Sequence, residues 1–116
     1  MTMAETATWT RVCSLDALVP DRGAAALVDG HQIAIFRLSD SGAVHAVAHH
    51  DPFSGANVMA RGLVGSRQGA ATVASPMHKQ SFDLVTGQCL DDPAVALRVW
   101  PTRVVDGWVE IGSGTT

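Results

Sequence analysis

Several features that mark common protein classes are scarce or missing in this sequence. Lys79 is its only lysine and the formal net charge is −3, so the chain offers no basic face of the kind that binds nucleic acid. No apolar run approaches the roughly 20 residues of a membrane-spanning helix. The first residues lack the basic and apolar regions of a signal peptide. We therefore expect a cytoplasmic protein with no nucleic-acid partner and no membrane partner.

Cysteine is also scarce, with only Cys13 and Cys89 in 116 residues. Two isolated thiols do not make the multi-bridge framework of a small secreted domain. They favour a reducing compartment, which agrees with the cytoplasm. We expect both to lie buried as small apolar side chains.

The composition is that of a compact globular protein. Hydrophobic residues make up 47% of the chain and charged residues 16%, a balance that separates it from disordered sequences. The length falls in the range of one domain. We expect a single domain across residues 1–116, with an ordered core of about 8–112.

The hydrophobic pattern predicts an all-β fold. Short alternating or apolar runs are separated by Gly, Asp and Ser, and no stretch has the 3.6-residue period of an amphipathic helix. Asp29-Gly30 suits a type I′ hairpin turn, because both central residues tolerate positive φ, and two strands near the end are expected to pair across Asp106-Gly107. The expected strands span residues 8–12, 24–28, 32–38, 43–48, 102–105 and 108–111.

Two local details refine this prediction. Residues 15–19 are expected to form one helical turn, with the hydroxyl of Ser14 as its N-cap. In the strand that follows the first hairpin turn, Ile33 and Ile35 share one face and their neighbours share the other. The regular hairpin spacing favours a sandwich or barrel.

The most informative stretch is residues 75–87. It contains Ser75-Pro76-Met77-His78 and then Phe82-Asp83-Leu84-Val85-Thr86-Gly87. This stretch resembles the second cluster-binding box of Rieske proteins, Cys-Pro-x-His-Gly followed by Phe-Asp-x-x-Thr-Gly. Ser75 stands at the cysteine position and Lys79 at the glycine position. A serine hydroxyl is a hard, weakly acidic ligand, whereas iron–sulfur clusters select soft thiolates.

The upstream box has also lost its cysteine. It reads Val47-Ala48-His49-His50-Asp51-Pro52-Phe53-Ser54-Gly55. Neither Cys13 nor Cys89 falls at a ligand position. His49, His50, Ser75 and His78 are therefore degenerate cluster-box positions, and we expect no [2Fe–2S] cluster, no other cofactor and no metal in this chain.

This combination resembles the small subunit of the assimilatory NAD(P)H-dependent nitrite reductase. Runs typical of that family are matched at residues 51–58, 61–65 and 74–80, and the resemblance extends from about Val12 to Ile111. It implies a Rieske-like antiparallel β-sandwich in which two loops, about 49–55 and 75–81, would clasp a cluster.

The same resemblance implies a function. The expected role is that of a small, non-catalytic cytoplasmic subunit, which supports the large subunit in reducing nitrite to ammonium during nitrate assimilation. In the resembled family the large subunit carries FAD, a [4Fe–4S] cluster and sirohaem. We therefore expect no catalytic residue in this chain, and its partner to be the large subunit.

Four residues at the two loops are candidates for docking that partner: Phe53, Met77, His78 and Lys79. They would form a rigid tip with apolar side chains and no cluster to explain its rigidity. The loop around Asp51 also has a structural interpretation, because Pro52 fixes φ and Gly55 permits a positive φ. Phe53 is thus either part of a rigid loop or an exposed anchor for a partner, and the two roles are compatible.

Two other kinds of site could be formed by residues of the same two loops. His49 or His50 with His78 and Asp51 would resemble a two-His-one-carboxylate metal site, although nothing in the spacing requires one. Ser75 with His78 would be a nucleophile–base pair, but the sequence supplies neither an orienting acid nor an oxyanion hole.

Two rival functions remain open at this point. One is a Rieske-type ferredoxin electron carrier, and the other is a free-standing binding module without a cluster. The missing thiolates oppose the first. The sequence does not give the subunit stoichiometry, the docking surface, the choice of NADH or NADPH, or whether the subunit is required for activity.

Overall fold

Ten strands and two short 3₁₀ helices make up the regular structure of the computed structural model, which describes residues 8–77 and 79–113. The strands are β1 (Trp9–Ser14), β2 (Gly23–Val28), β3 (His31–Arg37), β4 (Val44–Ala48), β5 (Leu63–Arg67), β6 (Ala70–Ala74), β7 (Ser81–Asp83), β8 (Val99–Trp100), β9 (Thr102–Val105) and β10 (Trp108–Gly112). The 3₁₀ helices are η2 (Leu15–Ala17) and η3 (Met59–Arg61). No helix in the described part of the chain is long and apolar enough to cross a membrane.

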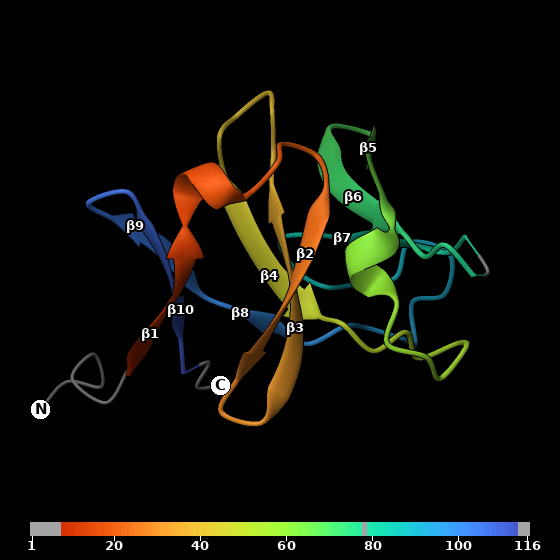
Figure 1. Ribbon diagram of the computed structural model, residues 1–116. Helices are drawn as coiled ribbons and strands as arrows, with labels where there is room; N and C mark the ends of the chain where they lie inside the picture. The colour runs from red at the N-terminus through yellow and green to blue at the C-terminus, as the bar shows by residue number, and fades with distance from the viewer. Residues whose placement is uncertain (1–7, 78, 114–116) are drawn as a thin grey trace, which may run out of the picture.

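The strands form three antiparallel sheets, so the predicted all-β fold is confirmed. A four-stranded sheet, β2-β3-β4-β8, lies between a three-stranded sheet β1-β10-β9 and a second three-stranded sheet β5-β6-β7 (Figure 1). The β1-β10-β9 sheet is at the left of the figure, and β5-β6-β7 with η3 is at the right.

The predicted type I′ turn and the second predicted hairpin are both present. Val28 pairs with His31 across Asp29-Gly30, whose φ angles are 51° and 80°. Asp106-Gly107 connects β9 to β10 with φ angles of 52° and 80°. The described residues hold a third turn with the same signs of φ, at Gln68-Gly69 between β5 and β6. This one was not predicted, because glutamine is not a typical residue at a positive φ.

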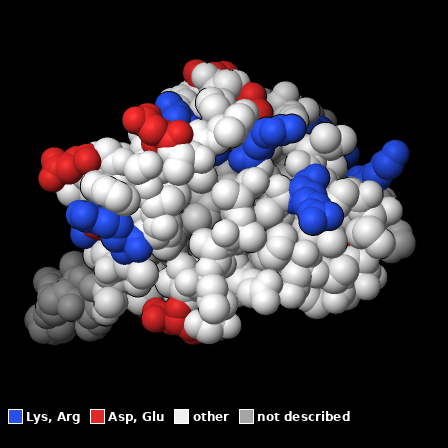
Figure 2. Space-filling model, in the orientation of Figure 1, with Lys and Arg blue, Asp and Glu red and all other residues white. Residues whose placement is uncertain are grey.

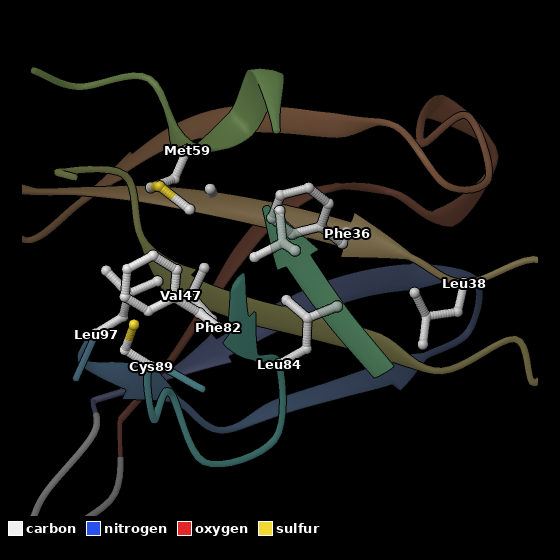
Figure 3. Close-up of a cluster of buried hydrophobic side chains, with 10 residues drawn as sticks. Phe36, Leu38, Val47, Met59, Phe82, Leu84, Cys89 and Leu97 are labelled. Carbon is white, nitrogen blue, oxygen red and sulfur yellow. The ribbon is translucent and has the colours of Figure 1, made fainter. Parts of the chain in front are cut away.

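The central sheet is buried on both faces, which gives the protein two hydrophobic cores. Ile33 and Ile35 of β3 belong to the core shared with the β1-β10-β9 sheet, together with Val109 and Ile111. Their neighbours, including Phe36, belong to the core shared with the β5-β6-β7 sheet. Figure 3 shows this second set of side chains, which surrounds Phe82. The alternation predicted for this strand is therefore confirmed.

The first turn of the chain differs from the prediction. β1 continues to Ser14, and the helical turn after it is a 3₁₀ helix of only three residues. Ser14 makes no side-chain hydrogen bond to cap it. Instead, the N–H of Leu15 donates to the carbonyl of Gly107 at 2.8 Å, so the β9–β10 turn satisfies one of the amides that the cap was expected to satisfy.

Candidate functional site

The first of the two box loops is a tight turn closed by backbone hydrogen bonds. The N–H of Gly55 donates to the carbonyl of Asp51 at 2.8 Å, and the N–H of Asp51 donates to the carbonyl of Ala56, also at 2.8 Å. Gly55 has a φ of 75°, in the left-handed region that glycine adopts without a steric cost. Residues 51–56 therefore form a self-contained loop that holds its own shape.

The second box loop repeats the first. The N–H of Lys79 donates to the carbonyl of Ser75 at 2.9 Å, and the N–H of Ser75 donates to the carbonyl of Gln80 at 2.9 Å. Each loop begins with a polar residue followed by proline. Lys79 occupies the position of Gly55 and has a φ of 65°. The strain of a left-handed non-glycine residue is thus placed at this loop.

The carboxylate of Asp51 joins the two loops. The hydroxyl of Ser75 donates to Asp51 Oδ2 at 2.6 Å, across 24 positions of sequence. Ser54 Oγ donates to the same oxygen at 2.9 Å, and the N–H of Phe53 donates to Oδ1 at 2.9 Å. Asp51 is 0% exposed and Ser75 1% exposed. The box positions thus meet through a buried hydrogen-bonded bridge, which we call the Asp51–Ser75 bridge.

Hydrogen bonding keeps this buried carboxylate charged. Burial raises the pKa of Asp51, but the hydrogen bonds from Ser75, Phe53 and Ser54 favour the ionised form and together outweigh burial, so the pKa lies below its usual range. A buried charge costs several kcal/mol when its acceptors are unused, and here both oxygens of Asp51 accept.

The two histidines of the first box point in different directions. His49 is buried, and its Nδ1 accepts a hydrogen bond from the N–H of Ala60 at 3.1 Å. Burial, with a smaller effect from Arg61, lowers the pKa of His49. His50 is exposed, and its Nδ1 lies 3.2 Å from Oδ1 of Asn57. His49 therefore supports η3, and the pair does not converge on one point.

The donor set does not fit a Rieske cluster. Such a centre needs two thiolates and two imidazoles. Ser75 stands at a thiolate position with its hydroxyl given to Asp51, and Cys89 is 1% exposed with its sulfur inside the core near Leu97 (Figure 3). Cys13 is half-buried on β1, at the edge of the other core, and so less buried than expected.

No group of three His, Cys, Asp or Glu side chains within residues 8–77 and 79–113 could hold a metal ion. Asp51, one member of the alternative two-His-one-carboxylate site, is engaged by Ser75 and Ser54. His78 lies outside the described residues, so its proposed part in that site and in the Ser75–His78 pair is not placed by the structure.

The Phe-Asp-x-x-Thr-Gly run that follows is a third loop of the same construction. The N–H of Gly87 donates to the carbonyl of Asp83 at 2.7 Å, and Asp83 Oδ1 accepts from the N–H of Val85 at 2.7 Å. Gly87 has a φ of 79°, and a Cβ there would lie 2.0 Å from the carbonyl oxygen of Leu97. Phe82 is 0% exposed. This run is therefore explained by packing alone.

The docking candidates differ in their exposure. Met77 is 54% exposed and Lys79 is exposed, as expected for a loop tip. Phe53 is half-buried: it packs on the core around Phe82, with 6.1 Å between the two ring centroids. The expectation of an exposed aromatic anchor at Phe53 needs this correction, because the ring is turned inward onto Phe82.

Truncation of Phe53 should therefore affect stability directly. Full burial makes Phe→Ala cost about 3–5 kcal/mol, so we expect Phe53→Ala to lower the free energy of unfolding by about 2 kcal/mol. Urea denaturation of the isolated protein measures this. The matched control is Met77→Ala at the exposed tip, which should change stability by less than about 0.5 kcal/mol. Equal losses in the two variants would contradict the placement of Phe53 on the core.

The chain is similar to known proteins over almost its whole length. Residues 8–112 match the family of the Rieske-like [2Fe–2S] domain. The chain is 41% identical over 103 residues to the nitrite reductase (NADH) small subunit of Salmonella typhimurium, which covers 89% of this chain and 95% of that one. The chain belongs to the nitrite reductase small subunits of the Rieske-like family.

Solved and fused relatives of this small-subunit family support the assignment. A crystal structure of an NADH-dependent nitrite reductase small subunit from Mycobacterium tuberculosis is 50% identical, with a TM-score of 0.90, and the match covers 95% of this chain and 98% of that one. A nitrite reductase [NAD(P)H] large subunit of Klebsiella oxytoca is 39% identical over 105 residues, which are 90% of this chain and 11% of that protein.

The resemblance drawn from the two boxes and the predicted fold class are thus confirmed. The missed feature is the role of Asp51, which was considered as a possible metal ligand and as a loop residue but not as the partner of Ser75. The repeated pattern of a polar residue followed by proline, at 51–52 and at 75–76, is the sequence signal that could have paired the two loops.

Proposed function

We propose that this protein is the small, non-catalytic subunit of a cytoplasmic NAD(P)H-dependent nitrite reductase. The observation that carries the proposal is the Asp51–Ser75 bridge, with 2.6 Å between Ser75 Oγ and Asp51 Oδ2. By the resemblance of the two boxes to Rieske sequences, it corresponds to the place where a Rieske protein would bind its cluster, and the family membership supplies the partner. In this proposal the two box loops keep the shape of a cluster-binding end but have a different function.

That function, in this proposal, is to dock the large subunit. The two box loops are held by their own hydrogen bonds, so a partner meets a surface that needs little ordering on binding. Met77 and Lys79 are exposed at its tip. In Figure 2 the charged side chains visible at the right-hand end, around η3 and the loops, are basic. An acidic surface on the large subunit would complement them. His78 is kept as a third docking candidate, and Phe53 supports the loop by packing on the core.

The chemistry of nitrite reduction belongs to the large subunit in this proposal. FAD, a [4Fe–4S] cluster and sirohaem would be bound there, and none of them in this chain. The large subunit of Klebsiella oxytoca, which contains a region like this chain, supports a close association of the two parts. No described side chain here is arranged to carry an electron or a proton to nitrite.

The direct test is assembly. The purified protein is immobilised and the large subunit of the same organism is passed over it in a surface plasmon resonance experiment, with an unrelated flavoprotein as the control. Saturable binding, together with co-purification from cells grown on nitrate, is expected. If the large subunit fails to bind in both assays, the subunit function is wrong and a free-standing binding module becomes the better interpretation.

Iron–sulfur reconstitution tests the rival function of an electron carrier. Anaerobic incubation with iron and sulfide should leave the visible spectrum of the purified protein flat, because Ser75 cannot supply a thiolate and Cys89 is buried in the core. The melting temperature should be the same with and without EDTA, since the Asp51–Ser75 bridge needs no metal. A Rieske-type EPR signal with stoichiometric iron would instead restore the ferredoxin role.

A further inference from the structure

The outer face of the β1-β10-β9 sheet carries a row of charged side chains. Arg11 on β1 is paired with Glu110 on β10, which is paired in turn with Arg103 on β9. The alternate residues of β10, Val109 and Ile111, are 0% exposed on the inner face. Strand alternation therefore places one carboxylate between two guanidinium groups on the outer face.

The carboxylate at the centre of the row is covered and the two arginines are not. Arg103 Nε donates to Glu110 Oε1 at 2.7 Å, and Arg11 Nε lies 3.7 Å from Oε2. The side chain of Glu110 is 11% exposed, whereas those of Arg11 and Arg103 are 52% and 47% exposed. The row thus presents two guanidinium groups to solvent and hides its only negative charge.

Two tryptophans hold the guanidinium groups in place. The Arg11 guanidinium carbon lies 5.0 Å from the ring centroid of Trp108, and that of Arg103 lies 4.2 Å from the ring centroid of Trp9. These are cation–π distances. The ion pairs that involve Glu110 use only Nε of each arginine. Among residues 8–77 and 79–113 no hydrogen-bond partner takes the terminal NH₂ groups of these two arginines, which leaves them for bidentate binding of an added carboxylate.

Acidic residues lie at the ends of this sheet, Asp106 in the β9–β10 turn and Asp16 in η2, but the row itself is positive. Two arginines and one glutamate leave it with one positive charge, while the chain as a whole has a formal charge of −3. Figure 2 shows acidic side chains at the left as well, close above the basic ones that lie over the β1-β10-β9 sheet. Trp108 remains 40% exposed beside them. Exposed tryptophan and arginine together are typical of the centres of protein interfaces.

We propose that this face binds an acidic segment of the large subunit, with Arg11 and Arg103 each taking an Asp or Glu side chain and Trp108 covering the apolar part of the contact. The inference rests on the proposed function and adds a second contact area. Figure 1 places this sheet at the end of the molecule opposite the β5-β6-β7 sheet and η3. A partner that reaches both ends would hold the subunit in one orientation.

Two variants, each of which removes one charge, change the net charge of the row in opposite directions. Arg103→Gln reduces the net charge of the row from one to zero, and Glu110→Gln raises it to two. We expect Arg103→Gln to weaken binding of the large subunit about tenfold and to flatten its salt dependence. Glu110→Gln should speed association about threefold at low salt. Surface plasmon resonance at two ionic strengths measures both.

Arg98→Gln is the matched control. Arg98 is exposed and also stacks on a tryptophan, 4.5 Å from the centroid of Trp100, but it precedes β8 of the central sheet. Its loss should change the affinity less than twofold. Melting curves of all three variants show whether each is folded, and Arg11→Gln replaces Arg103→Gln if the latter does not fold.

The outcomes separate the two proposals. If the wild-type protein binds the large subunit and neither Arg103→Gln nor Glu110→Gln changes the affinity or the association rate, the row only stabilises the sheet and this inference is wrong. If the wild-type protein does not bind, the subunit function fails first and this inference fails with it. Opposite changes in the two variants, with Arg98→Gln unchanged, support an acidic partner at this face.

Discussion

Asp51→Ala is expected to lower the free energy of unfolding by about 4 kcal/mol. The substitution removes the acceptor of three hydrogen bonds, those from Ser75, Ser54 and the N–H of Phe53. Hydrogen bonds to charged groups contribute about 1.5–3 kcal/mol each, and they are not additive when they share one carboxylate. Ser75, which is 1% exposed, would also lose its acceptor without gaining access to water.

Asp91→Ala provides the control for this prediction. Asp91 also accepts from a backbone N–H and from a side chain, at Ser81 and Arg67, but it lies at the surface. We expect its loss to have a much smaller effect, because surface ion pairs are screened and its partners regain water. Urea denaturation monitored by tryptophan fluorescence measures both. A similar, small loss for the two variants would show that the Asp51–Ser75 bridge does not stabilise the fold.

The same carboxylate predicts a dependence on pH. The pKa of Asp51 is lower in the folded protein than its ordinary value of 3.8. Its contribution to stability is therefore complete above that ordinary value, and it is lost as the pH falls through the lower pKa of the folded state. In Asp51→Asn this group no longer titrates. The difference in unfolding free energy between wild type and Asp51→Asn should be constant near neutral pH and shrink below about pH 4.

Lys79→Glu is expected to weaken binding of the large subunit about a hundredfold, or about 2.7 kcal/mol. Each of the three similar loops has one residue with a positive φ at the same position. Gly55 and Gly87 hold the left-handed position in two of them, and Lys79 holds it in the third with a φ of 65°. A left-handed non-glycine residue costs about 1–2 kcal/mol of conformational free energy. A lysine is therefore present at this position although it lowers the stability of the loop. Strain of this kind is concentrated at functional sites.

Lys79→Gly separates the two effects of this residue. Relief of the backbone strain should make the isolated protein more stable by about 0.5–1 kcal/mol. This figure already includes the opposing entropic cost of the more flexible glycine in the unfolded chain. The same variant should bind the large subunit about tenfold more weakly, because the positive charge is gone. Melting curves and surface plasmon resonance on one preparation give both numbers.

Gln68→Gly is the matched control, since Gln68 also has a positive φ, of 53°, in an exposed turn. It should gain stability in the same way without any change in binding. If Lys79→Gly and Lys79→Glu both bind as tightly as the wild type, the docking surface lies elsewhere. The positive φ of Lys79 would then be only a structural feature of its loop.

The parts of the fold that sequence reasoning predicted depend on local chemistry. The turns at Asp29-Gly30 and Asp106-Gly107 were found because their residue types tolerate positive φ. The sharing of one face by Ile33 and Ile35 followed from the two-residue period of a strand. The β5-β6-β7 sheet was not predicted, because its hairpin turns at Gln68 and its strand β5 is largely exposed.

The candidate site depended on contacts between distant segments, which local patterns do not show. The boxes and their missing thiolates could be read directly from the residues. The pairing of Asp51 with Ser75 could not, because it depends on two loops meeting across 24 positions. The inward orientation of Phe53 likewise depends on the position of Phe82, which follows from the packing of β7.

The Asp51–Ser75 bridge also bears on how the protein matures. It consists of side chains that the chain itself supplies, so the loop end forms in the same step as the rest of the fold. In a small domain whose fold includes a metal cluster, the free energy of metal binding is part of the free energy of folding. The apo protein then completes its fold only after the metal is delivered. In the proposed subunit without a cluster, assembly of this end would depend neither on iron supply nor on thiolates that oxygen can damage.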